Sequence, residues 1–388
     1  MILLGSTGSI GVNTLEIAKK FALNVEVLVA GRNIDLLNSQ IKEHNPKKVI
    51  IASKDDIKKV NHKNVFFGEE AILEAIEDSS SKTVVNALVG FLGLKPTLKA
   101  IECGKKIALA NKESLVVAGK FIDQKNLSAI DSEHFGLWYL LQDKKIDSMT
   151  ITASGGSFRD YPLESLKNVS IKEALNHPNW KMGNKITIDS ATMTNKMFEL
   201  IEAAWLFGTK KLDAVIEPKS LVHALINFKD GSTTAHIANA SMQLPISYAI
   251  LGRVDCEILK PIDLLEISSL EFKKIEESRY PIWSLKDEIL NNLDLGVVLN
   301  AANEVAVSKF LSGKIGFLDI SKISLEAINR FNSLKASNIE DIFEIDKEVR
   351  RYFDSWSFNS FWNFVNLSNI SNIFKSKVWE EYCKAIWR

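Results

Sequence analysis

The first third of the chain alternates short apolar runs with stretches of helical spacing, and this alternation constrains the fold most. The runs expected to form strands are Ile2–Leu4, Val25–Ala30, Lys48–Ala52, Thr83–Leu88, Lys106–Leu109 and Ala129–Asp131. The helical patterns between them are Asn13–Lys20, Asn33–Glu43, Glu69–Ile76 and Lys95–Cys103. Such alternation is typical of a parallel sheet with helices on both faces. We therefore predict an α/β fold with an N-terminal Rossmann-like, doubly wound parallel sheet.

The rest of the chain is expected to form further domains, because 388 residues exceed one ordinary core. Residues 147–255 mix strand and helix patterns and predict a central α+β catalytic domain with a mixed sheet. Residues 256–281 read as a connecting segment, and residues 282–352 as a small C-terminal helical domain. Residues 1–146 form the predicted N-terminal domain, and residues 353–388 are an atypical tail rich in Asn, Ser, Phe and Trp.

The charge balance and the cysteines exclude several classes of function. The chain has 48 basic and 48 acidic residues, which argues against a general nucleic-acid binder. The 3 cysteines are scattered without a CxxC pair, so neither a disulfide framework nor a zinc–thiolate site is expected. No secretory signal and no run long enough to span a membrane is recognised. We expect a cytoplasmic protein.

A glycine loop, Gly5-Ser6-Thr7-Gly8-Ser9-Ile10-Gly11, follows the first predicted strand and opens a helix. Glycines let the backbone turn tightly and approach a pyrophosphate at the helix N-terminus. A plain tight turn is the alternative, and the lack of a Lys-Ser/Thr pair excludes a Walker-type loop. After the second strand, Arg32 stands where an NAD site usually has a carboxylate. An arginine would neutralise a 2′-phosphate, so we favour NADP.

Two carboxylates, Asp131 and Glu133, follow the last predicted strand of the N-terminal domain. In extended chain, residues two apart point the same way, so these two are expected to share one cation. The same alternation would turn His134 away from them. With Glu199 as a third carboxylate and no spaced histidine pair, the pattern favours Mg²⁺ or Mn²⁺ over zinc. A solvated turn is the alternative for the pair alone.

Three further segments carry polar side chains. Ala110–Ser114 follows a strand and places Lys112 and Glu113 near the same crevice, unless it is only a solvated helix start. His177–Gly183 is a loop with two large side chains, Trp180 and Met182, and reads either as a pinned loop or as a lid. In Asp189–Glu199, helical spacing puts Asn195, Lys196 and Glu199 on one face, and Ser190, Asn195 and Lys196 make a candidate phosphate cradle.

These segments, in this order, resemble the 1-deoxy-D-xylulose 5-phosphate reductoisomerase family. The shared motifs are GSTGSIG, ANKES, DSEH, SGG, HPNWKMG, DSATMTNK and LNAANE (Leu299–Glu304). The resemblance covers roughly residues 1 to 350, and the tail beyond Ser355 does not resemble the family. It implies an NADPH domain, a catalytic domain with a mobile loop, a C-terminal helical domain and a homodimer.

The resemblance also implies roles for individual residues. The implied NADPH contacts are Thr7, Gly8, Ser9, Ile10, Gly31, Arg32, Asn33, Asn111, Glu113 and Gly183. The implied metal ligands are Asp131, Glu133 and Glu199. The implied substrate and catalytic residues are Lys112, Ser132, Glu133, Ser154, His177, Ser190, Asn195, Lys196 and Glu199, with Trp180 and Met182 on the lid.

The implied reaction is the isomerisation of 1-deoxy-D-xylulose 5-phosphate and its NADPH-dependent reduction to 2-C-methyl-D-erythritol 4-phosphate, the committed step of non-mevalonate isoprenoid synthesis. Two rival interpretations use parts of the pattern. An NADP-dependent sugar-phosphate or aldehyde dehydrogenase would need the glycine loop and Arg32 but not three carboxylates. A non-enzymatic NADP-sensing regulator would need neither the carboxylates nor the lid.

Overall fold

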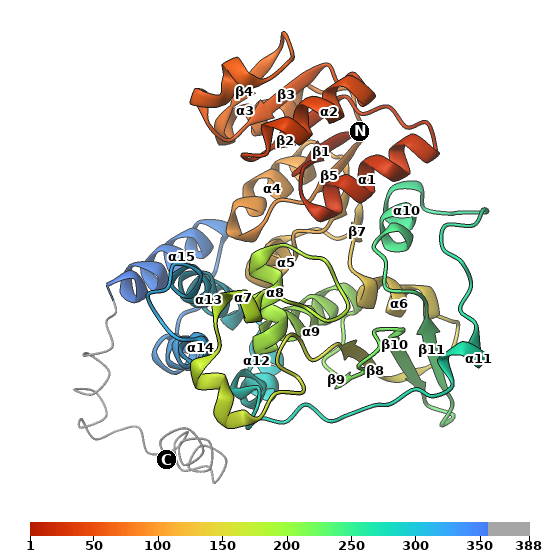
Figure 1. The fold of residues 1–388 in the computed structure, drawn as a ribbon, viewed down its shortest axis with the longest axis vertical. Helices are drawn as coiled ribbons and strands as arrows, with labels where there is room; N and C mark the ends of the chain where they lie inside the picture. Colours follow the sequence, from red (N-terminus) through yellow and green to blue (C-terminus); the bar gives the residue numbers. More distant parts are fainter. Residues whose placement is uncertain (356–388) are drawn as a thin grey trace. The chain divides into compact units, whose positions relative to one another are not determined.

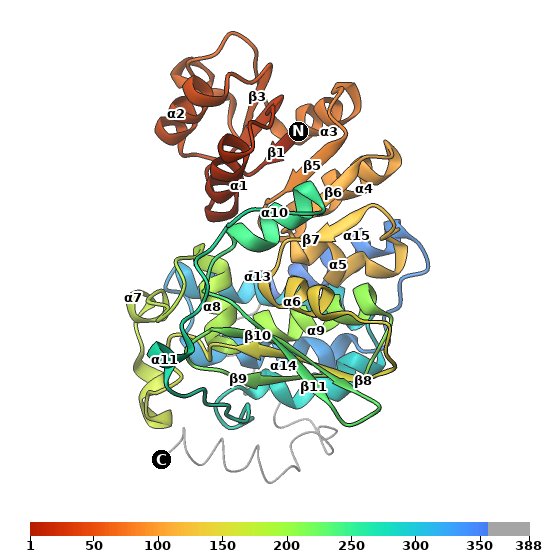
Figure 2. The same ribbon diagram turned by 90° about the vertical axis from the view of Figure 1, so that its right-hand side faces the viewer.

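The computed structural model describes residues 1–355, and the predicted tail lies outside the described residues except for its first three positions. The contacts divide the chain into two compact units. Figures 1 and 2 show the elements of the chain, coloured along the sequence. The first unit comprises Met1–Ile151, Trp205–Leu212 and Ser220–Ser269. The second comprises Thr152–Ala204, Asp213–Lys219 and the described residues from Leu270 onward. Each unit is described separately below.

A seven-stranded parallel sheet forms the N-terminal part of the first unit, in the order β4-β3-β2-β1-β5-β6-β7. The strands are β1 (Ile2–Leu4), β2 (Val27–Ala30), β3 (Lys48–Ile51), β4 (Val65–Phe67), β5 (Thr83–Asn86), β6 (Lys106–Leu109) and β7 (Leu127–Ala129). The central strand β1 pairs in parallel with β2 on one side and with β5 on the other. The direction in which the sheet grows therefore reverses at β1, and this switch point is where such folds bind ligands.

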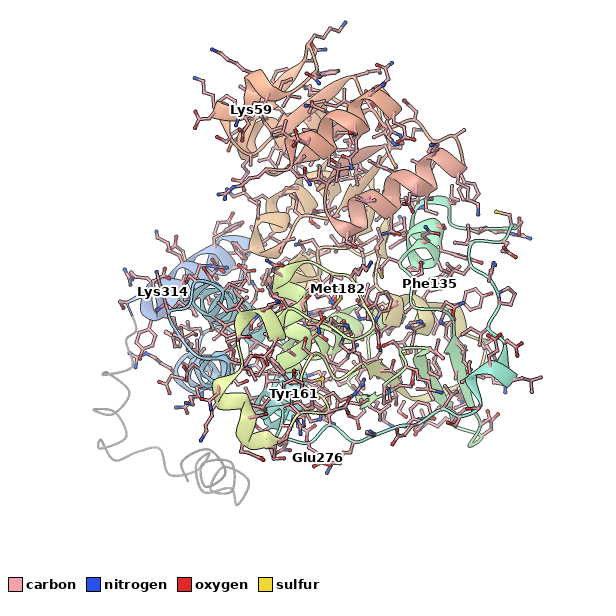
Figure 3. All side chains as sticks on the ribbon, in the orientation of Figure 1. Lys59, Phe135, Tyr161, Met182, Glu276 and Lys314 are labelled. Carbon is pink, nitrogen blue, oxygen red and sulfur yellow. The ribbon has the colours of Figure 1, made fainter. Side chains whose placement is uncertain are left out.

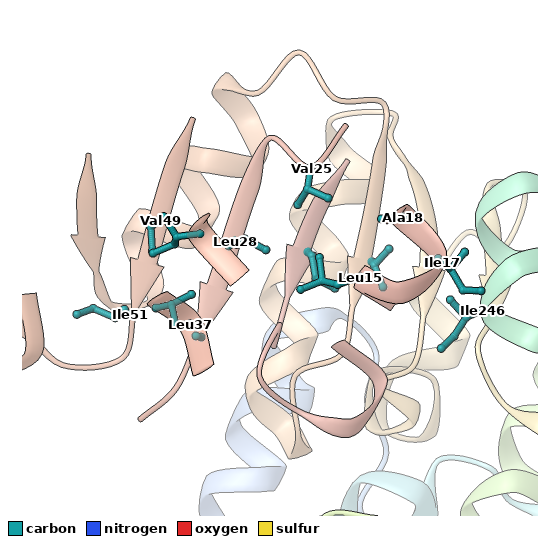
Figure 4. Packing of buried hydrophobic residues seen from close by; sticks show 14 of the residues in the cluster. Leu15, Ile17, Ala18, Val25, Leu28, Leu37, Val49, Ile51 and Ile246 are labelled. Atoms are coloured by element: carbon teal, nitrogen blue, oxygen red, sulfur yellow. The ribbon is translucent and has the colours of Figure 1, made fainter. Parts of the chain in front are cut away.

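Six helices connect or follow these strands. They are α1 (Ser9–Lys20), α2 (Ile34–His44), α3 (Gly68–Asp78), α4 (Leu94–Glu102), α5 (Lys112–Ala118) and α6 (Ser132–Leu140). A buried apolar cluster joins one face of the sheet to α1 and α2 (Figure 4). Its members Leu3, Leu28 and Leu37 are fully inaccessible to solvent. This cluster fixes the strand ends, and so it positions the loops that follow β1 and β2.

The first unit also contains most of a second, mixed sheet. It has the order β11-β10-β8-β9, from β8 (Ile146–Ala153), β9 (Leu212–Ile216), β10 (Val222–Phe228) and β11 (Thr233–Ile237). Strand β10 is antiparallel to both β8 and β11. Helix α6 packs on β10 and β11, which requires a glycine at Gly136 because a Cβ there would lie 2.9 Å from Cβ of Ala224. The first unit also contains α10 (Gln243–Leu251), which packs on α1, and the short helix α11 (Leu264–Ile267).

The second unit is mainly helical. Its helices are α7 (Ile171–Ala174), α8 (Asn184–Thr192), α9 (Thr194–Phe207), α12 (Lys286–Asn291), α13 (Leu295–Leu311), α14 (Phe317–Phe331) and α15 (Ile339–Asp354). Helix α13 is buried between α14 and α15 and also contacts α8 (Figure 1). Edge-on aromatic contacts at Phe317, with Phe158 at 4.8 Å and Phe310 at 5.9 Å between ring centroids, tie the chain after the Ser154 loop to this helical core.

The predicted fold class is confirmed, although several elements differ from the prediction. The strand predicted at Ala129–Asp131 is instead β7, which ends at Ala129, and Asp131 caps α6. The elements β4, α5, α6, α7 and α10 were not predicted, because they are short or lack a clean apolar period. Helix α15 was not predicted either, although its buried residues Ile342, Ile345 and Val349 have helical spacing. Between Met1 and Ser355, no helix combines the length and apolarity needed to cross a membrane.

Candidate active site

The loop after β1 has the backbone geometry that its glycines predict. Gly5 adopts a φ of +86°, and a Cβ there would lie 2.5 Å from the carbonyl oxygen of Ala87. A Cβ at Gly11 would lie 2.2 Å from the carbonyl oxygen of Gly5, so α1 approaches the loop closely only because this residue is glycine. Gly8 caps α1 without a side-chain acceptor, and the helix end can therefore receive an anion.

The turn after β2 carries the predicted 2′-phosphate reader. Gly31, Arg32 and Asn33 are all exposed at the same edge of the sheet as the glycine loop. The Asn33 side chain accepts a hydrogen bond of 3.2 Å from the backbone N–H of Leu36 and so caps α2. This bond fixes the turn at the start of α2, and the side chain of Arg32 in the same turn is exposed.

The ANKES segment is a buried helix start rather than a solvated one. Asn111 caps α5, accepting from the N–H and the hydroxyl of Ser114, and its amide donates to the carbonyls of Leu88 and Gly90 and to Glu113. Asn111 is 1% exposed. The side chain of Asn111 is therefore engaged in holding the loop after β5 against α5. This engagement also requires Gly93, where a Cβ would lie 2.2 Å from the Asn111 side chain.

Asp131 and Glu133 lie at the start of α6, not along a strand. Oδ1 of Asp131 accepts from the backbone N–H groups of Glu133 (3.0 Å) and His134 (3.1 Å), and Oδ2 accepts from Nζ of Lys112 (3.2 Å). Oε2 of Glu133 accepts from the Ser132 hydroxyl at 2.7 Å. These contacts bring Lys112 and Ser132 to the two carboxylates.

The strand argument for the pair is therefore wrong, because the capping preference of Asp overrides a short extended run. The prediction that alternation points His134 away from the pair is wrong for the same reason. In the first turn of the helix, Nδ1 of His134 lies 3.3 Å from Oδ1 of Asp131.

In the second unit, the Ser154-Gly155-Gly156 turn is packed on α8. Gly155 and Gly156 have φ values of +87° and +70°, and a Cβ on Gly156 would lie 2.5 Å from Cα of Ala191 and 2.7 Å from the carbonyl oxygen of Ser190. This close approach brings the backbone of the Ser154 turn onto the end of α8 that carries Ser190. Two of the implied substrate residues, Ser154 and Ser190, are thereby on adjoining segments.

Two residues that the sequence reading did not identify hold this turn in place. The hydroxyl of Tyr280, which is 1% exposed, donates to the carbonyl of Gly155 at 2.8 Å. The Arg159 guanidinium donates to the carbonyls of Ser154 (2.7 Å) and Pro218 (3.1 Å). Tyr280 lies 125 residues from its partner, so no local sequence signal could have revealed it.

His177 joins the Ser154 turn to the loop that contains Trp180 and Met182. Its Nε2 lies 2.8 Å from the Ser154 hydroxyl, and its Nδ1 accepts from the backbone N–H groups of Asn179 (3.1 Å) and Trp180 (3.0 Å). Burial, aided by the nearby positive charge of Arg159, lowers the pKa of His177 to about 4. Trp180 and Met182 are both half-buried, and Met182 precedes α8 (Figure 3). Gly183 caps that helix.

The face shared by Asn195, Lys196 and Glu199 on α9 is confirmed and buried. Both Asn195 and Lys196 donate to the Glu199 carboxylate, and Lys196 and Glu199 are 5% and 2% exposed. Oδ1 of Asn195 is buried without a hydrogen-bond partner among residues 1–355. A polar face of this kind is suited to a charged, oxygen-rich ligand rather than to solvent.

A glycine loop at the switch point of a doubly wound sheet is typical of the class of dinucleotide-binding enzymes. Family profiles agree on the particular family. "1-deoxy-D-xylulose 5-phosphate reductoisomerase" matches residues 1–119, and two C-terminal domain profiles of that enzyme match residues 127–207 and 237–352. The chain belongs to the 1-deoxy-D-xylulose 5-phosphate reductoisomerase family.

Individual relatives support the assignment. The reductoisomerase of Nautilia profundicola is 56% identical over 363 residues, which cover 92% of this chain and 99% of the relative. A crystal structure of DOX-P reductoisomerase with NADPH, fosmidomycin and magnesium superposes with a TM-score of 0.82 at 34% identity, covering 91% and 97% of the two chains. The enzyme from Zymomonas mobilis with NADPH gives 0.81 at 33% identity, covering 92% and 99%.

Proposed function

We propose that this protein converts 1-deoxy-D-xylulose 5-phosphate to 2-C-methyl-D-erythritol 4-phosphate, using NADPH and a divalent metal. The observation that carries the proposal is the family match, because its first two segments, residues 1–119 and 127–207, contain every predicted site residue. The reaction needs a hydride donor, a group that polarises the substrate's oxygens, a binding site for its phosphate and the exclusion of water. The chain's residues supply or bind each of these.

NADPH is proposed to bind along the carboxyl ends of β1 and β2. Its pyrophosphate would rest on the Gly5–Gly11 loop, with Thr7, Gly8, Ser9 and Ile10 as contacts. Arg32, with Gly31 and Asn33, would take the 2′-phosphate. Further contacts are assigned to Asn111, Glu113 and Gly183. The buried Asn111 side chain supports this site by fixing the loop after β5.

The divalent metal is proposed to bind Asp131, Glu133 and Glu199. The donor set fits Mg²⁺ or Mn²⁺, since all three ligands are carboxylates. When bound, the ion supplies Lewis acidity to the carbonyl and hydroxyl oxygens of the substrate. Lys112 already donates to Asp131, and Lys196 to Glu199, so each unit holds its carboxylate in a fixed orientation beside a positive charge.

The substrate phosphate is proposed to bind Ser154, Ser190, Asn195 and Lys196. The Ser154 hydroxyl accepts from the Gly156 N–H at 3.1 Å and lies 2.8 Å from His177 Nε2. With both acceptor positions occupied, its own proton is left to donate to a phosphate oxygen. Remote binding energy of this kind orients the reacting carbons.

The His177–Gly183 segment is proposed to act as a lid. Trp180 and Met182 would then cover the reacting groups and keep water from the substrate during the reaction. His177 contacts the backbone of this segment on one side and Ser154 on the other. Closure of the lid is therefore linked to the phosphate ligands.

The protein is also proposed to be a cytoplasmic homodimer that binds neither nucleic acid nor membrane. Strand β11 is at the edge of its sheet, and beside it Trp138 and Tyr139 of α6 are 50% and 54% exposed. Aromatic side chains next to the open edge of a sheet are typical of an interface between subunits. Light scattering after gel filtration should give twice the mass of 43.4 kDa, and a monomer would contradict this part of the proposal.

Product analysis separates the proposed function from its rivals. The protein is incubated with ¹³C-labelled 1-deoxy-D-xylulose 5-phosphate, NADPH and Mg²⁺, and the carbon connectivity of the product is read by NMR. A branched product supports the reductoisomerase. Reduction without rearrangement would indicate a simple dehydrogenase, and no product despite NADPH binding would indicate a regulator.

A further inference from the structure

The LNAANE motif of α13 carries two asparagines that no proposed ligand contact explains. Asn300 and Asn303 are three residues apart and are both completely buried. Neither amide atom of Asn300 has a hydrogen-bond partner within residues 1–355. Buried amides are costly for stability unless they are bonded, so their place in a helix core calls for a specific partner.

Asn303 has that partner on α8, the helix that leads to the proposed phosphate ligands. Its Nδ2 donates to Oδ1 of Asp189 at 2.7 Å. The other carboxylate oxygen, Oδ2, accepts from Nζ of Lys185 at 2.7 Å, one turn earlier on α8. Asp189 is 2% exposed, so α13 and α8 together fix a buried carboxylate through both of its oxygens.

The carboxylate lies at a strained corner of the backbone. Met193, between α8 and α9, adopts a φ of +68°, which is unfavourable for a residue with a side chain. The corner is held by bonds from Thr192 Oγ1 to the carbonyl of Asp189 (3.2 Å) and from the N–H of Met193 to the carbonyl of Ser190 (3.2 Å). Asp189 thus lies in the last turn of α8, which leads directly into the corner between Ser190 and the start of α9.

We propose that Asn303 is a positioning residue for substrate binding. Through Asp189 it sets the α8–α9 corner, and so it sets the placement of Ser190, Asn195 and Lys196 for the substrate's phosphate. The inference rests on the proposed function of those three side chains. Asn303 itself contacts neither substrate nor cofactor.

The first test replaces Asn303 with leucine, which has a similar shape but no donor. Oδ1 of Asp189 then loses its partner, and the carboxylate is held only through Oδ2, by its bond from Lys185. We expect KM for 1-deoxy-D-xylulose 5-phosphate to rise about ten-fold, equivalent to about 1.4 kcal/mol. The dissociation constant of fosmidomycin, used as the phosphonate probe, should rise similarly, whereas KM for NADPH should stay within about two-fold of wild type. Unchanged affinity for both phosphate-type ligands, or equal losses for substrate and NADPH, would overturn the inference.

The matched control is Ser324→Ala. Ser324 is equally buried in the second unit, and among residues 1–355 its side chain bonds only to the carbonyl of Ile320 in its own helix α14. This variant should show normal KM values for both substrate and NADPH. A ten-fold rise in its substrate KM would mean that general loosening of the unit, rather than Asn303, controls affinity.

A charge-swapped pair provides a rescue. Asn303→Asp alone sets two carboxylates against each other and should weaken substrate binding at least as much as leucine does. Adding Asp189→Asn restores a donor toward position 303 and keeps an acceptor toward Lys185, so the substrate KM should recover. No recovery in the folded double variant would contradict the proposal.

Should the Asn303 variants fail to fold, Lys185→Met removes the other bond to Asp189 from a side chain that is 15% exposed. It should raise the substrate KM selectively, and an unchanged KM would overturn the inference. Wild-type protein with no turnover would instead refute the proposed function itself.

Discussion

The imidazole of His177 and the hydroxyl of Ser154 form a pair with a defined direction of hydrogen bonding. Nδ1 of His177 accepts from two backbone N–H groups, so the proton of the neutral ring is on Nε2, which donates to Ser154 Oγ across 2.8 Å. Ser154 in turn also accepts from Gly156. The pair thus links the Trp180 loop to a serine whose own proton is available to a phosphate.

This arrangement predicts that His177 stays neutral throughout the physiological pH range. Its pKa is lowered to about 4, chiefly by burial, from an ordinary value near 6.5. Between these values the unfolded chain binds a proton that the folded one does not, so the contribution of this group destabilises the fold as pH falls from 6.5 to 4. Selective ¹³C labelling of the 6 histidines, with His177→Gln for assignment, should show no titration of this ring between pH 7 and 5. A midpoint near 6.5 would contradict the prediction.

An alanine at position 156 is expected to clash with α8, in addition to straining the backbone at its positive φ. Gly156 and Gly313 have nearly equal φ values, +70° and +71°, but only Gly156 has neighbours within reach of a Cβ. Gly313→Ala should cost about 1–2 kcal/mol from the left-handed conformation alone. Gly156→Ala should cost roughly 1–3 kcal/mol more from the clash with α8, and it should raise the substrate KM. Melting temperatures and KM values measure both, and equal effects in the two variants would refute the steric account.

Arg32 is expected to set the preference for NADPH over NADH. Arg32→Asp replaces an attraction to the 2′-phosphate by a repulsion, so we expect kcat/KM for NADPH to fall at least about a hundred-fold and that for NADH to change little. Arg253→Asp makes the same change of charge at a residue that is paired with the exposed Asp255, and it is the control. If kcat/KM falls equally for NADPH and NADH in Arg32→Asp, this arginine does not recognise the 2′-phosphate.

The three carboxylates are expected to be needed for turnover but not for cofactor binding. Glu199→Gln and Asp131→Asn each remove a negative charge from the proposed metal ligands while preserving the shape of the side chain. We expect kcat to fall by about a thousand-fold or more, as when a major electrostatic contribution to catalysis is lost. NADPH binding, followed by fluorescence, should remain near normal. Near-normal turnover at limiting Mg²⁺ in either variant would remove that residue from the metal site.

Much of the N-terminal fold could be predicted because its elements have strong local signals. Buried parallel strands are continuous apolar runs, and the glycine loop joins the first strand to the first helix, so the class of fold follows from the pattern. The i,i+4 spacing of Asn195 and Glu199 likewise predicts their contact, and the structure confirms it.

The remaining features could not be predicted because two local structures compete for the same residues, or because the contacting residues are far apart in the sequence. At Asp131 the same residues suit either the end of a strand or a helix cap, and the capping bonds to Glu133 and His134 decide the outcome. The bonds from Tyr280 to Gly155 and from Asn303 to Asp189 join segments 125 and 114 residues apart. No pattern within a short window reports such pairs, although they fix the turns on which the predicted site residues lie.

The most direct test of the central claim is the oxidation of NADPH by the protein, followed by absorbance, with 1-deoxy-D-xylulose 5-phosphate as substrate. The account predicts oxidation that requires the sugar phosphate, is restored by Mg²⁺ or Mn²⁺ after chelation, and is not supported by NADH at similar concentrations. Absence of oxidation in metal-loaded protein that still binds NADPH would contradict it.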